Sequence, residues 1–474
     1  MEKRTPSGFL AALRERAFTP IDIASLVFFR IAFGVLMAWQ VCHYFSHGWV
    51  RQFWIEPHFL FKYYGFSWVR PWPGNGLYIH VAVLGVLALF IAMGFLYRLS
   101  TTLFFIGWTY LFLLDEGLWR NHPYLISLFS FLLIFVPANR AFAVDSWLRP
   151  SIRTETIPSW TLWILRFQMG VVYFFAGIAK INPDWFHAEQ IRAMLIVSGQ
   201  PALLAQFLAK PAVYYTFAYA SLAFDLSIVA LLLWRRTRIA AFCLAVVFHL
   251  INARLFPLEV FPWFSIAATT LFLSPEWPRR VFTLFRKPAP MHRVEKVGPA
   301  VQWKQNLILS AVTVYVAIQA LVPLRHFLYH GGIEWWYGEH RFSWRMMIQN
   351  AWGQGIFYVT DPNTGRTARV DPLDRLPPWQ AKQLGFRPDM IVQFAKYLAE
   401  CFPPFGPKPV QVEARVSVSL NGRKPELLID PNVDLAQEKI PLGRPRWLRE
   451  IHAPLPDPRP DPRDNPFAPK LPGL

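Results

Sequence analysis

Residues 77–114 read LYIHVAVLGVLALFIAMGFLYRLSTTLFFIGWTYLFLL and carry a single formal charge, that of Arg98. A run of about 20 apolar residues is long enough to cross the hydrocarbon core of a bilayer as an α-helix. The stretch therefore predicts two membrane spans, near 77–97 and 99–114, with Arg98 in a tight turn between them. The core of a single soluble domain would not use so much apolar surface over this length.

Comparable apolar segments recur along the first 330 residues, and together they predict about nine transmembrane helices. The composition agrees, because 54% of the residues are hydrophobic and 16% are charged, whereas an ordinary soluble domain has about 25% charged residues. The expected spans lie near 21–44, 77–97, 99–114, 123–139, 158–180, 212–234, 239–256, 259–274 and 306–324.

The net charge of +18 comes from basic residues that lie between the apolar segments, not from one stripe with interleaved aromatic residues. This distribution argues against nucleic-acid binding and is typical of loops that face the cytoplasm. When nine spans alternate, every basic cluster falls on one side. The sequence therefore predicts a multi-pass membrane protein with a cytoplasmic N-terminus and an extracytoplasmic C-terminal domain.

The predicted fold class is an all-α polytopic membrane domain followed by a small α+β, β-rich extracytoplasmic domain. In the second domain, turn residues predict hairpins over 354–371 and over 409–430, the latter around Asn421-Gly422, with a helix over 388–402 between them. The expected boundaries are a cytoplasmic segment 1–20, the membrane domain 21–330, the extracytoplasmic domain 331–450 and a Pro-rich, poorly ordered tail 451–474. Segments 45–72 and 186–208 are too polar to span and are expected along the outer interface.

Four ionisable residues lie within predicted spans, where charge is costly and is a candidate for function. They are Arg30, Arg166, Asp225 and His249. The alternative for the charged ones is internal pairing that fixes helix packing, since a buried charge needs a partner. His249 and Asn252 are three residues apart, so they share one face of a helix.

Lys180 ends the apolar run VVYFFAGIAK at the predicted outer boundary. Ala176-Gly177 in this run would allow another helix to approach closely. One interpretation of Lys180 is a snorkelling side chain that anchors the helix end. The other is a partly desolvated amine with a lowered pKa that acts as a base.

Asn121-His122-Pro123 has two interpretations as well, because a polar residue before Pro is an ordinary helix start. His43 and His47 have a metal-compatible spacing, but no third ligand is indicated, so no metal site is predicted. The three cysteines, Cys42, Cys243 and Cys401, have no metal-type spacing and define no disulfide framework.

Four segments together resemble the vitamin K-dependent gamma-carboxylase family, whose membrane part is called the HTTM domain. Their order and spacing agree from about residue 20 to 440. The segments are LYRLSTTLFFIGWTYLFLLDEGLWRNHPYL (96–125), RFQMGVVYFFAGIAKINPDW (166–185), FHLINARLF (248–256) and EHRFSWRMMI (339–348).

The resemblance implies an enzyme that oxidises vitamin K hydroquinone with O2 to its 2,3-epoxide. This oxidation generates a base that removes a γ-proton from a peptidyl glutamate, and CO2 then adds to give γ-carboxyglutamate. The implied substrates are thus the reduced naphthoquinone, O2, CO2 and a peptide or protein glutamate, with no metal.

The resemblance also implies roles for individual residues. Lys180 occupies the position of the family's catalytic base in its AG-x-x-K segment, and His122 that of the histidine implicated in carbanion formation. Asn121, His249 and Asn252 are expected to bind the quinone. Trp344, Met346 and Met347 are expected to bind the substrate.

Two features depart from the animal members of the family. Animal enzymes carry two adjacent lysines where this chain has Ala179 and Lys180, and they have a much longer C-terminal region that helps to bind substrate propeptides. Quinol epoxidation without peptide carboxylation is therefore one alternative function. A non-enzymatic transporter or lipid-binding protein is another, although a transporter would favour internal repeats and broken helices that are not evident in this sequence.

Overall fold

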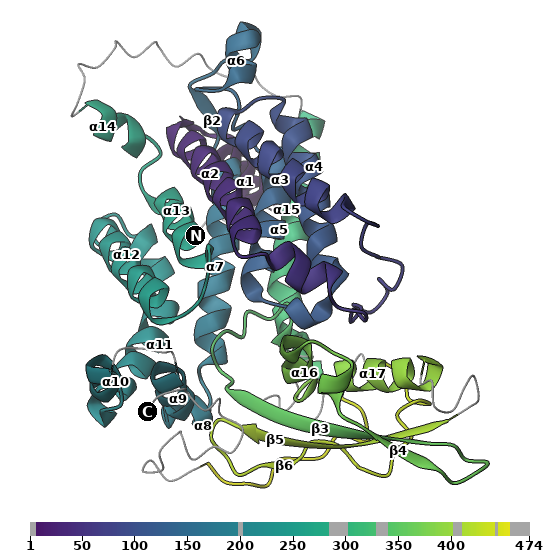
Figure 1. Ribbon diagram of the computed structural model, residues 1–474. Helices are drawn as coiled ribbons and strands as arrows, with labels where there is room; N and C mark the ends of the chain where they lie inside the picture. Colours follow the sequence, from purple (N-terminus) through teal and green to yellow (C-terminus); the bar gives the residue numbers. More distant parts are fainter. Residues whose placement is uncertain are drawn as a thin grey trace.

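The computed structural model describes residues 6–197, 202–283, 302–328, 340–401, 410–440 and 444–455. Apolar helices form the first part of the chain, and a four-stranded sheet with two helices follows them (Figure 1). The sheet lies across one end of the helical part, and α6 and α14 lie at the opposite end. The structure is therefore mostly helical with a later sheet-containing region, as predicted.

Nine apolar helices follow the predicted spans to within a few residues. They are α2 (Ala24–Ser46), α3 (Gly76–Met93), α4 (Tyr97–Leu114), α5 (Asn121–Phe135), α7 (Trp160–Ala179), α11 (Pro211–Leu233), α12 (Arg238–Leu255), α13 (Phe261–Thr269) and α15 (Gln302–Leu321). Among the described residues, six helices are long and apolar enough to cross a membrane, namely α2, α3, α7, α11, α12 and α15 with its extension to Arg325. The helices α5 and α13 are apolar but shorter, so a count of nine spans is not confirmed.

Shorter elements connect these helices. At the end away from the sheet are α1 (Pro6–Phe18), β1 (Pro20–Asp22), α6 (Val144–Leu148), η3 (Pro150–Ile152), β2 (Thr156–Pro158) and α14 (Trp277–Thr283). The others are η1 (Arg51–Ile55), η2 (Glu116–Leu118), α8 (Pro183–Phe186), α9 (Glu189–Val197), α10 (Ala202–Leu208), η4 (Thr270–Phe272) and η5 (Val322–Leu328).

Three segments on the predicted cytoplasmic side meet at the end of the molecule away from the sheet, namely the N-terminal segment, the loop before α7 and the segment after α13. The strands β1 and β2 pair antiparallel, which joins the N-terminal segment to the loop before α7. The backbone N–H of Ser25 donates to the carbonyl of Pro275 at 3.0 Å, and Arg279 forms an ion pair with Asp22 at 2.8 Å. The helices therefore bring these three segments to one face, as alternating spans require.

The two arginines within predicted spans donate hydrogen bonds to backbone carbonyls. Arg30 donates to the carbonyls of Ala138 and Phe142 at 2.8 and 2.6 Å. Arg166 donates to those of Leu271 and Leu273 at 2.7 and 3.0 Å. These carbonyls lie at or after helix ends, where helices leave acceptors without intrahelical partners. Both arginines thus fix helix packing.

The sheet has the antiparallel order β4-β3-β5-β6, formed by β3 (Ala351–Thr360), β4 (Thr367–Val370), β5 (Gln411–Leu420) and β6 (Glu426–Leu427). Both predicted hairpins, β3–β4 and β5–β6, are confirmed. The remaining elements are η8 (Pro372–Asp374), α16 (Pro378–Leu384) and α17 (Pro388–Cys401), and α17 confirms the predicted helix. Alternate residues of β5, such as Val412, Ala414 and Val416, are buried against Ile391 and Phe394 of α17.

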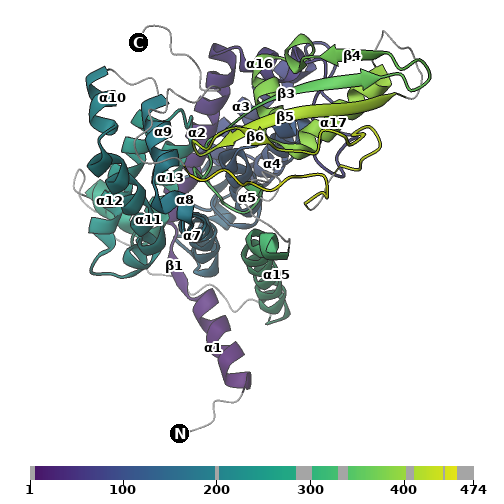
Figure 2. The ribbon, with the colours of Figure 1, turned by 90° about the horizontal axis from the view of Figure 1, so that it is seen from below.

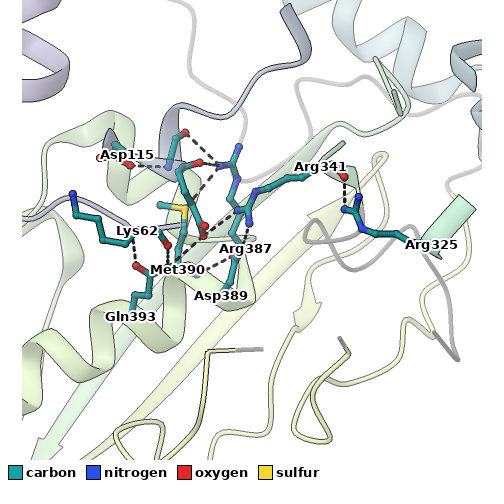
Figure 3. Close-up of polar contacts among 10 residues, drawn as sticks. Lys62, Asp115, Arg325, Arg341, Arg387, Asp389, Met390 and Gln393 are labelled. Atoms are coloured by element: carbon teal, nitrogen blue, oxygen red, sulfur yellow. Dashed lines mark hydrogen bonds and ion pairs between the residues drawn. The ribbon is translucent and has the colours of Figure 1, made fainter. Parts of the chain in front are cut away.

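A buried cluster of charged and polar groups joins the sheet region to the loop after α4 (Figure 3). Arg341 lies between Glu116, at 3.2 Å, and Asp389, with which it also forms an ion pair. Gln380 of α16 donates to Asp115 at 2.7 Å, and Arg387 donates to the carbonyl of Glu116 at 3.0 Å. Since α16 and α17 lie between the sheet and the helices (Figure 1), this cluster fixes how the two parts sit together.

Most of the predicted Pro-rich tail falls outside the described residues. The predicted interfacial segment 186–208 contains α9 and α10, and segment 45–72 contains the end of α2 and η1.

Candidate functional site

Lys180 follows α7 at the end of the helical part that faces the sheet, and its side chain is only 7% exposed. It forms an ion pair with Asp225 of α11, and its amine lies 5.2 Å from the ring centre of Trp185. A snorkelling lysine would extend along the surface toward water. The side chain of Lys180 is instead enclosed by protein.

Gly177 allows the approach of α11 that makes this pair possible. A Cβ atom at position 177 would lie 2.7 Å from the Cδ2 atom of Leu226 and 3.2 Å from its backbone nitrogen. Only a glycine accommodates α11 at this distance, as the Ala176-Gly177 pattern predicted. Because Leu226 follows Asp225, the same contact places the carboxylate next to Lys180.

The buried pair has a chemical consequence. An ammonium and a carboxylate stabilise each other, but both are costly to hold away from water. Transfer of one proton from Lys180 to Asp225 converts the pair to a neutral amine and a neutral acid. This arrangement can therefore supply a neutral lysine, ready to accept a proton, without leaving an unpaired charge behind.

His122 is the second residue of α5 and lines a cavity whose walls are mainly aromatic side chains. The cavity has a volume of about 580 Å³ including space open to solvent. Its lining comprises Tyr44, Trp49, Phe53, Trp54, Trp108, Leu111, Phe112, Leu118, Arg120, His122, Pro123 and Glu259. Such a cavity, apolar with a few polar groups at one place, suits a flat aromatic ligand.

The polar groups of the cavity gather around the carboxylate of Glu259. Arg120 forms an ion pair with it, Gln40 donates to it at 3.0 Å, and the Nε2 atom of His122 lies 3.8 Å away. Burial alone would raise the pKa of Glu259, but His122, Arg120 and Gln40 outweigh burial and lower it to about 2. The carboxylate is thus charged at neutral pH.

His249 is buried on α12, and its Nε2 atom lies 2.8 Å from the hydroxyl of Tyr173. Its Nδ1 atom has no hydrogen-bond partner among the described residues. The ring of Phe261 lies 6.2 Å from the rings of both His249 and His122, so a single side chain touches the two histidines.

Asn252 and Asn121 occupy different surroundings. The amide of Asn252 donates to the carbonyl of Phe248 on its own helix, at 3.0 Å. Neither His249 nor Asn252 is among the residues that line the His122 cavity. Asn121 begins α5, and within the described chain its buried Oδ1 atom accepts no hydrogen bond.

Trp344, Met346 and Met347 lie in the segment that leads into β3. Trp344 is fully buried and stacks on Tyr124, two residues after His122, with ring centres 5.0 Å apart. Met346 is half-buried and packs against the main helical core, and Met347 is half-buried too. The segment therefore contacts the helix that carries His122.

The same segment has an unusual backbone. Phe342, Trp344 and Met347 have φ values of 60°, 57° and 57°, in the left-handed region that bulky residues rarely adopt. Such conformations cost of order 1–3 kcal/mol each and persist where the surroundings dictate them, often at ligand sites. Here the packing of Phe342 on Trp119, with ring centres 4.5 Å apart, and of Trp344 on Tyr124 holds them.

Two relationships were not predicted from the sequence. Asp225 had been singled out as an intramembrane charge, but its pairing with Lys180 joins helices that are distant in sequence. Glu259 lies in the loop between α12 and α13, and nothing singled it out. A signal does exist, because Glu259 is the only acidic residue in the apolar segment FPLEVFPWF (256–264).

Fold and site together define a class of protein. It is a polytopic membrane protein with a buried lysine–carboxylate pair and a histidine-bearing aromatic cavity on the side that a sheet domain covers. Sequence comparisons identify the family. The profile of the HTTM domain matches residues 18–277, and that of the vitamin K-dependent gamma-carboxylase lumenal domain matches residues 304–453. The chain therefore belongs to the vitamin K-dependent gamma-carboxylase family. No solved structure matches it.

Proposed function

We propose that the chain is a membrane-embedded gamma-glutamyl carboxylase that couples oxidation of vitamin K hydroquinone to carboxylation of peptidyl glutamate. Family membership supports the carboxylase class. The observation that carries the reaction is the burial of Lys180 beside Asp225, at the end of α7 nearest the sheet domain. The reaction needs its base at the boundary between membrane and water, because the quinol is dissolved in the membrane and the peptide in water.

Lys180 is the group that takes a proton from the hydroquinone. It does so as the neutral amine, after its own proton has passed to Asp225. Trp185 and the α11 helix exclude water from the pair, so the proton passes between Lys180 and Asp225 and not to solvent. Asp225 thus acts as the proton partner of the base.

The residues near His122 fit a reduced naphthoquinone. The aromatic walls suit the flat ring system, and His122 offers a hydrogen bond to one of its oxygens. Asn121 and His249 do not line the cavity, and they are assigned to the same ligand by resemblance. The unpartnered Nδ1 of His249 and Oδ1 of Asn121 support this assignment, since buried polar atoms ordinarily have partners. Asn252 is assigned to the same ligand only by resemblance.

The hydroquinone supplies the driving force when bound: O2 converts it to the 2,3-epoxide and water, and generates a base stronger than any side chain. His122 assists formation of the glutamate carbanion, as the resemblance implies, and the nearby Glu259 supports its ring. The half-buried Met346 and Met347 bind the peptide beside it, the fully buried Trp344 supports their segment, and CO2 adds to the γ-carbon. The products are γ-carboxyglutamate, the epoxide and water.

Product analysis tests this proposal. Purified protein is incubated with vitamin K hydroquinone, O2, labelled bicarbonate and a glutamate-containing peptide. We expect both the epoxide and label in the peptide. Epoxide without peptide label would establish a quinol epoxidase that lacks carboxylation. Neither product, from monodisperse protein, would contradict the enzymatic function and leave a transporter or lipid-binding protein.

A further inference from the structure

The loop that follows Lys180 is held by the sheet domain. Asp184, on α8, accepts two hydrogen bonds from the guanidinium of Arg423, at 2.6 and 2.8 Å. The amide of Asn421 donates to the same carboxylate at 2.7 Å. The Asp184 side chain is 7% exposed and that of Arg423 14%, so the pair is shielded from solvent. Figure 2 shows α8 beside the β5–β6 end of the sheet.

The hairpin turn that carries Asn421 and Arg423 is itself rigid. Asn421 and Gly422 have φ values of 51° and 81°, which asparagine and glycine tolerate best. Asn421 exchanges two hydrogen bonds with Asn350, at 2.8 and 2.9 Å. The Nε atom of Arg423 also donates to the carbonyl of Ala453 at 3.1 Å. The turn can therefore act as a fixed support.

A series of local hydrogen bonds and ring contacts connects Asp184 to Lys180. Asn182 accepts a hydrogen bond from the backbone of Trp185 at 2.8 Å and donates to the carbonyl of Ala179 at 2.8 Å. The indole of Trp185 donates to the carbonyl of Ala218 on α11 at 3.0 Å. The same indole faces the Lys180 amine. Holding Asp184 thus holds Trp185 over Lys180.

We propose that Arg423 and Asn421 form a clamp on Asp184 that positions Lys180, keeping it dry and paired with Asp225. The catalytic part of this inference rests on the proposed function, whereas the clamp itself does not. Without the clamp the loop would open and water would reach Lys180. The amine would then be accessible to added reagents, which it is not while the loop is closed over it.

The first test needs no turnover. Intact, detergent-purified protein is treated by reductive methylation over a range of pH, and modification of Lys180 is measured by mass spectrometry. We expect Lys180 to be protected in the unaltered protein and modified about tenfold faster in Arg423→Gln, because a buried amine reacts only after opening. Arg415→Gln is the matched control, since Arg415 is exposed on β5, the strand that leads into the turn.

Two more conservative variants show whether the effect of Arg423→Gln comes from misfolding. Arg423→Lys keeps the charge but loses the two-pronged contact, and Asn421→Gly keeps the turn but loses the amide donor. In both variants Lys180 should be modified at a rate between those of the unaltered protein and Arg423→Gln. Protection of Lys180 equal to that of the unaltered protein in these variants, or in Arg423→Gln, would overturn the clamp.

The second test measures epoxide formation against pH. In Arg423→Gln we expect kcat to fall between about 10-fold and 100-fold, since a small displacement of a reacting group has effects of that size. The pH profile of activity should also change, since opening the loop alters the surroundings of the proposed base, whereas a merely structural loss of active protein would leave the profile unchanged. An unchanged pH profile would overturn the positioning role. If the protein forms no epoxide but the labelling responds as expected, the proposed function fails and the clamp stands.

Discussion

Lys180 shows how a single side chain depends on its partner. A lysine at a helix end is an ordinary anchor, and its local sequence cannot tell anchor from base. The tertiary contact with Asp225 changes that, because a buried pair can exchange its proton internally. Arginine in the same place would keep the ion pair but would not release a proton in the accessible pH range.

We therefore predict that Lys180→Arg is as inactive as Lys180→Ala, although it folds better. Arginine preserves the partner of Asp225, whereas alanine leaves a buried carboxylate alone, at a cost of about 3–5 kcal/mol. Epoxide formation and the thermal unfolding midpoint of monodisperse variants test the two parts. An active Lys180→Arg protein would show that Lys180 is a structural residue and that the base lies elsewhere.

Asp115 gives a pH-dependent prediction outside the membrane spans. Burial raises the pKa of Asp115 to about 7, despite hydrogen bonds from Gly117 and Gln380 and the nearby charges of Lys62 and Arg387. A carboxyl whose pKa is raised by folding contributes stability while it is protonated. That contribution is complete below the unfolded-state value and is lost as the pH rises through about 7.

Asp115→Asn should remove this loss, because an amide stays neutral. Its oxygen can accept from Gly117, and its nitrogen can donate to the Oε1 atom of Gln380, which has no partner within the described residues. Relative to the unaltered protein, the variant should gain roughly 2 kcal/mol between about pH 5.5 and about pH 8. Thermal unfolding at the two pH values measures this gain. A difference independent of pH would show that Asp115 does not titrate in this range.

At the scale of elements, the distance between α7 and α11 decides whether the pair forms. Gly177 is the contact point, and its neighbours on α11 include a backbone atom that cannot rotate away. Another glycine of α7, Gly170, faces the same helix with more room, because a Cβ atom there would lie 3.5 Å from Val229. The two positions form a natural comparison.

Gly177→Ala should separate the helices, lower stability by about 1–3 kcal/mol and strongly reduce epoxide formation. Gly170→Ala should leave activity unchanged, and it can stabilise α7 slightly, because alanine favours the helix. Unfolding midpoints and rates for the two variants provide the comparison. Equal behaviour of both would mean that α11 does not need its present approach to α7.

At the scale of the whole molecule, the sheet domain lies at one face, together with the Lys180–Asp225 pair and the His122 cavity. The β1–β2 pair and α14 lie at the other face. Clustered charges such as Arg341, Glu116 and Asp389 fix the sheet domain to the helices. In the proposed function, a peptide captured on that domain would be presented at the same face as the candidate site.

We predict that the sheet domain is extracytoplasmic and that the loop before α7 is cytoplasmic, since the basic residues favour the cytoplasmic side. Single-cysteine variants Asn363→Cys and Ser151→Cys test this, because both positions are exposed. The three natural cysteines are free and would be replaced first. In intact cells an impermeant thiol reagent should label position 363 and not 151. The reverse pattern would invert the topology.

The sequence by itself determined the membrane class, the positions of the apolar helices and both hairpins of the sheet domain. These features depend on local properties: apolar length, the placement of basic residues and turn residues such as Asn421-Gly422. The motifs also indicated the family, which the domain matches established. The assignments of Lys180, His122 and the other candidate residues to catalysis and binding stay predictions.

Only the tertiary structure decided the partners. The contacts of Lys180 with Asp225, Glu259 with Arg120, and Asp184 with Arg423 each join segments far apart in the chain. An ion pair depends on how the helices and loops pack in space. The neighbours of a residue in sequence do not determine this packing. The membrane spans could be recognised one at a time, whereas the site exists only after they have packed.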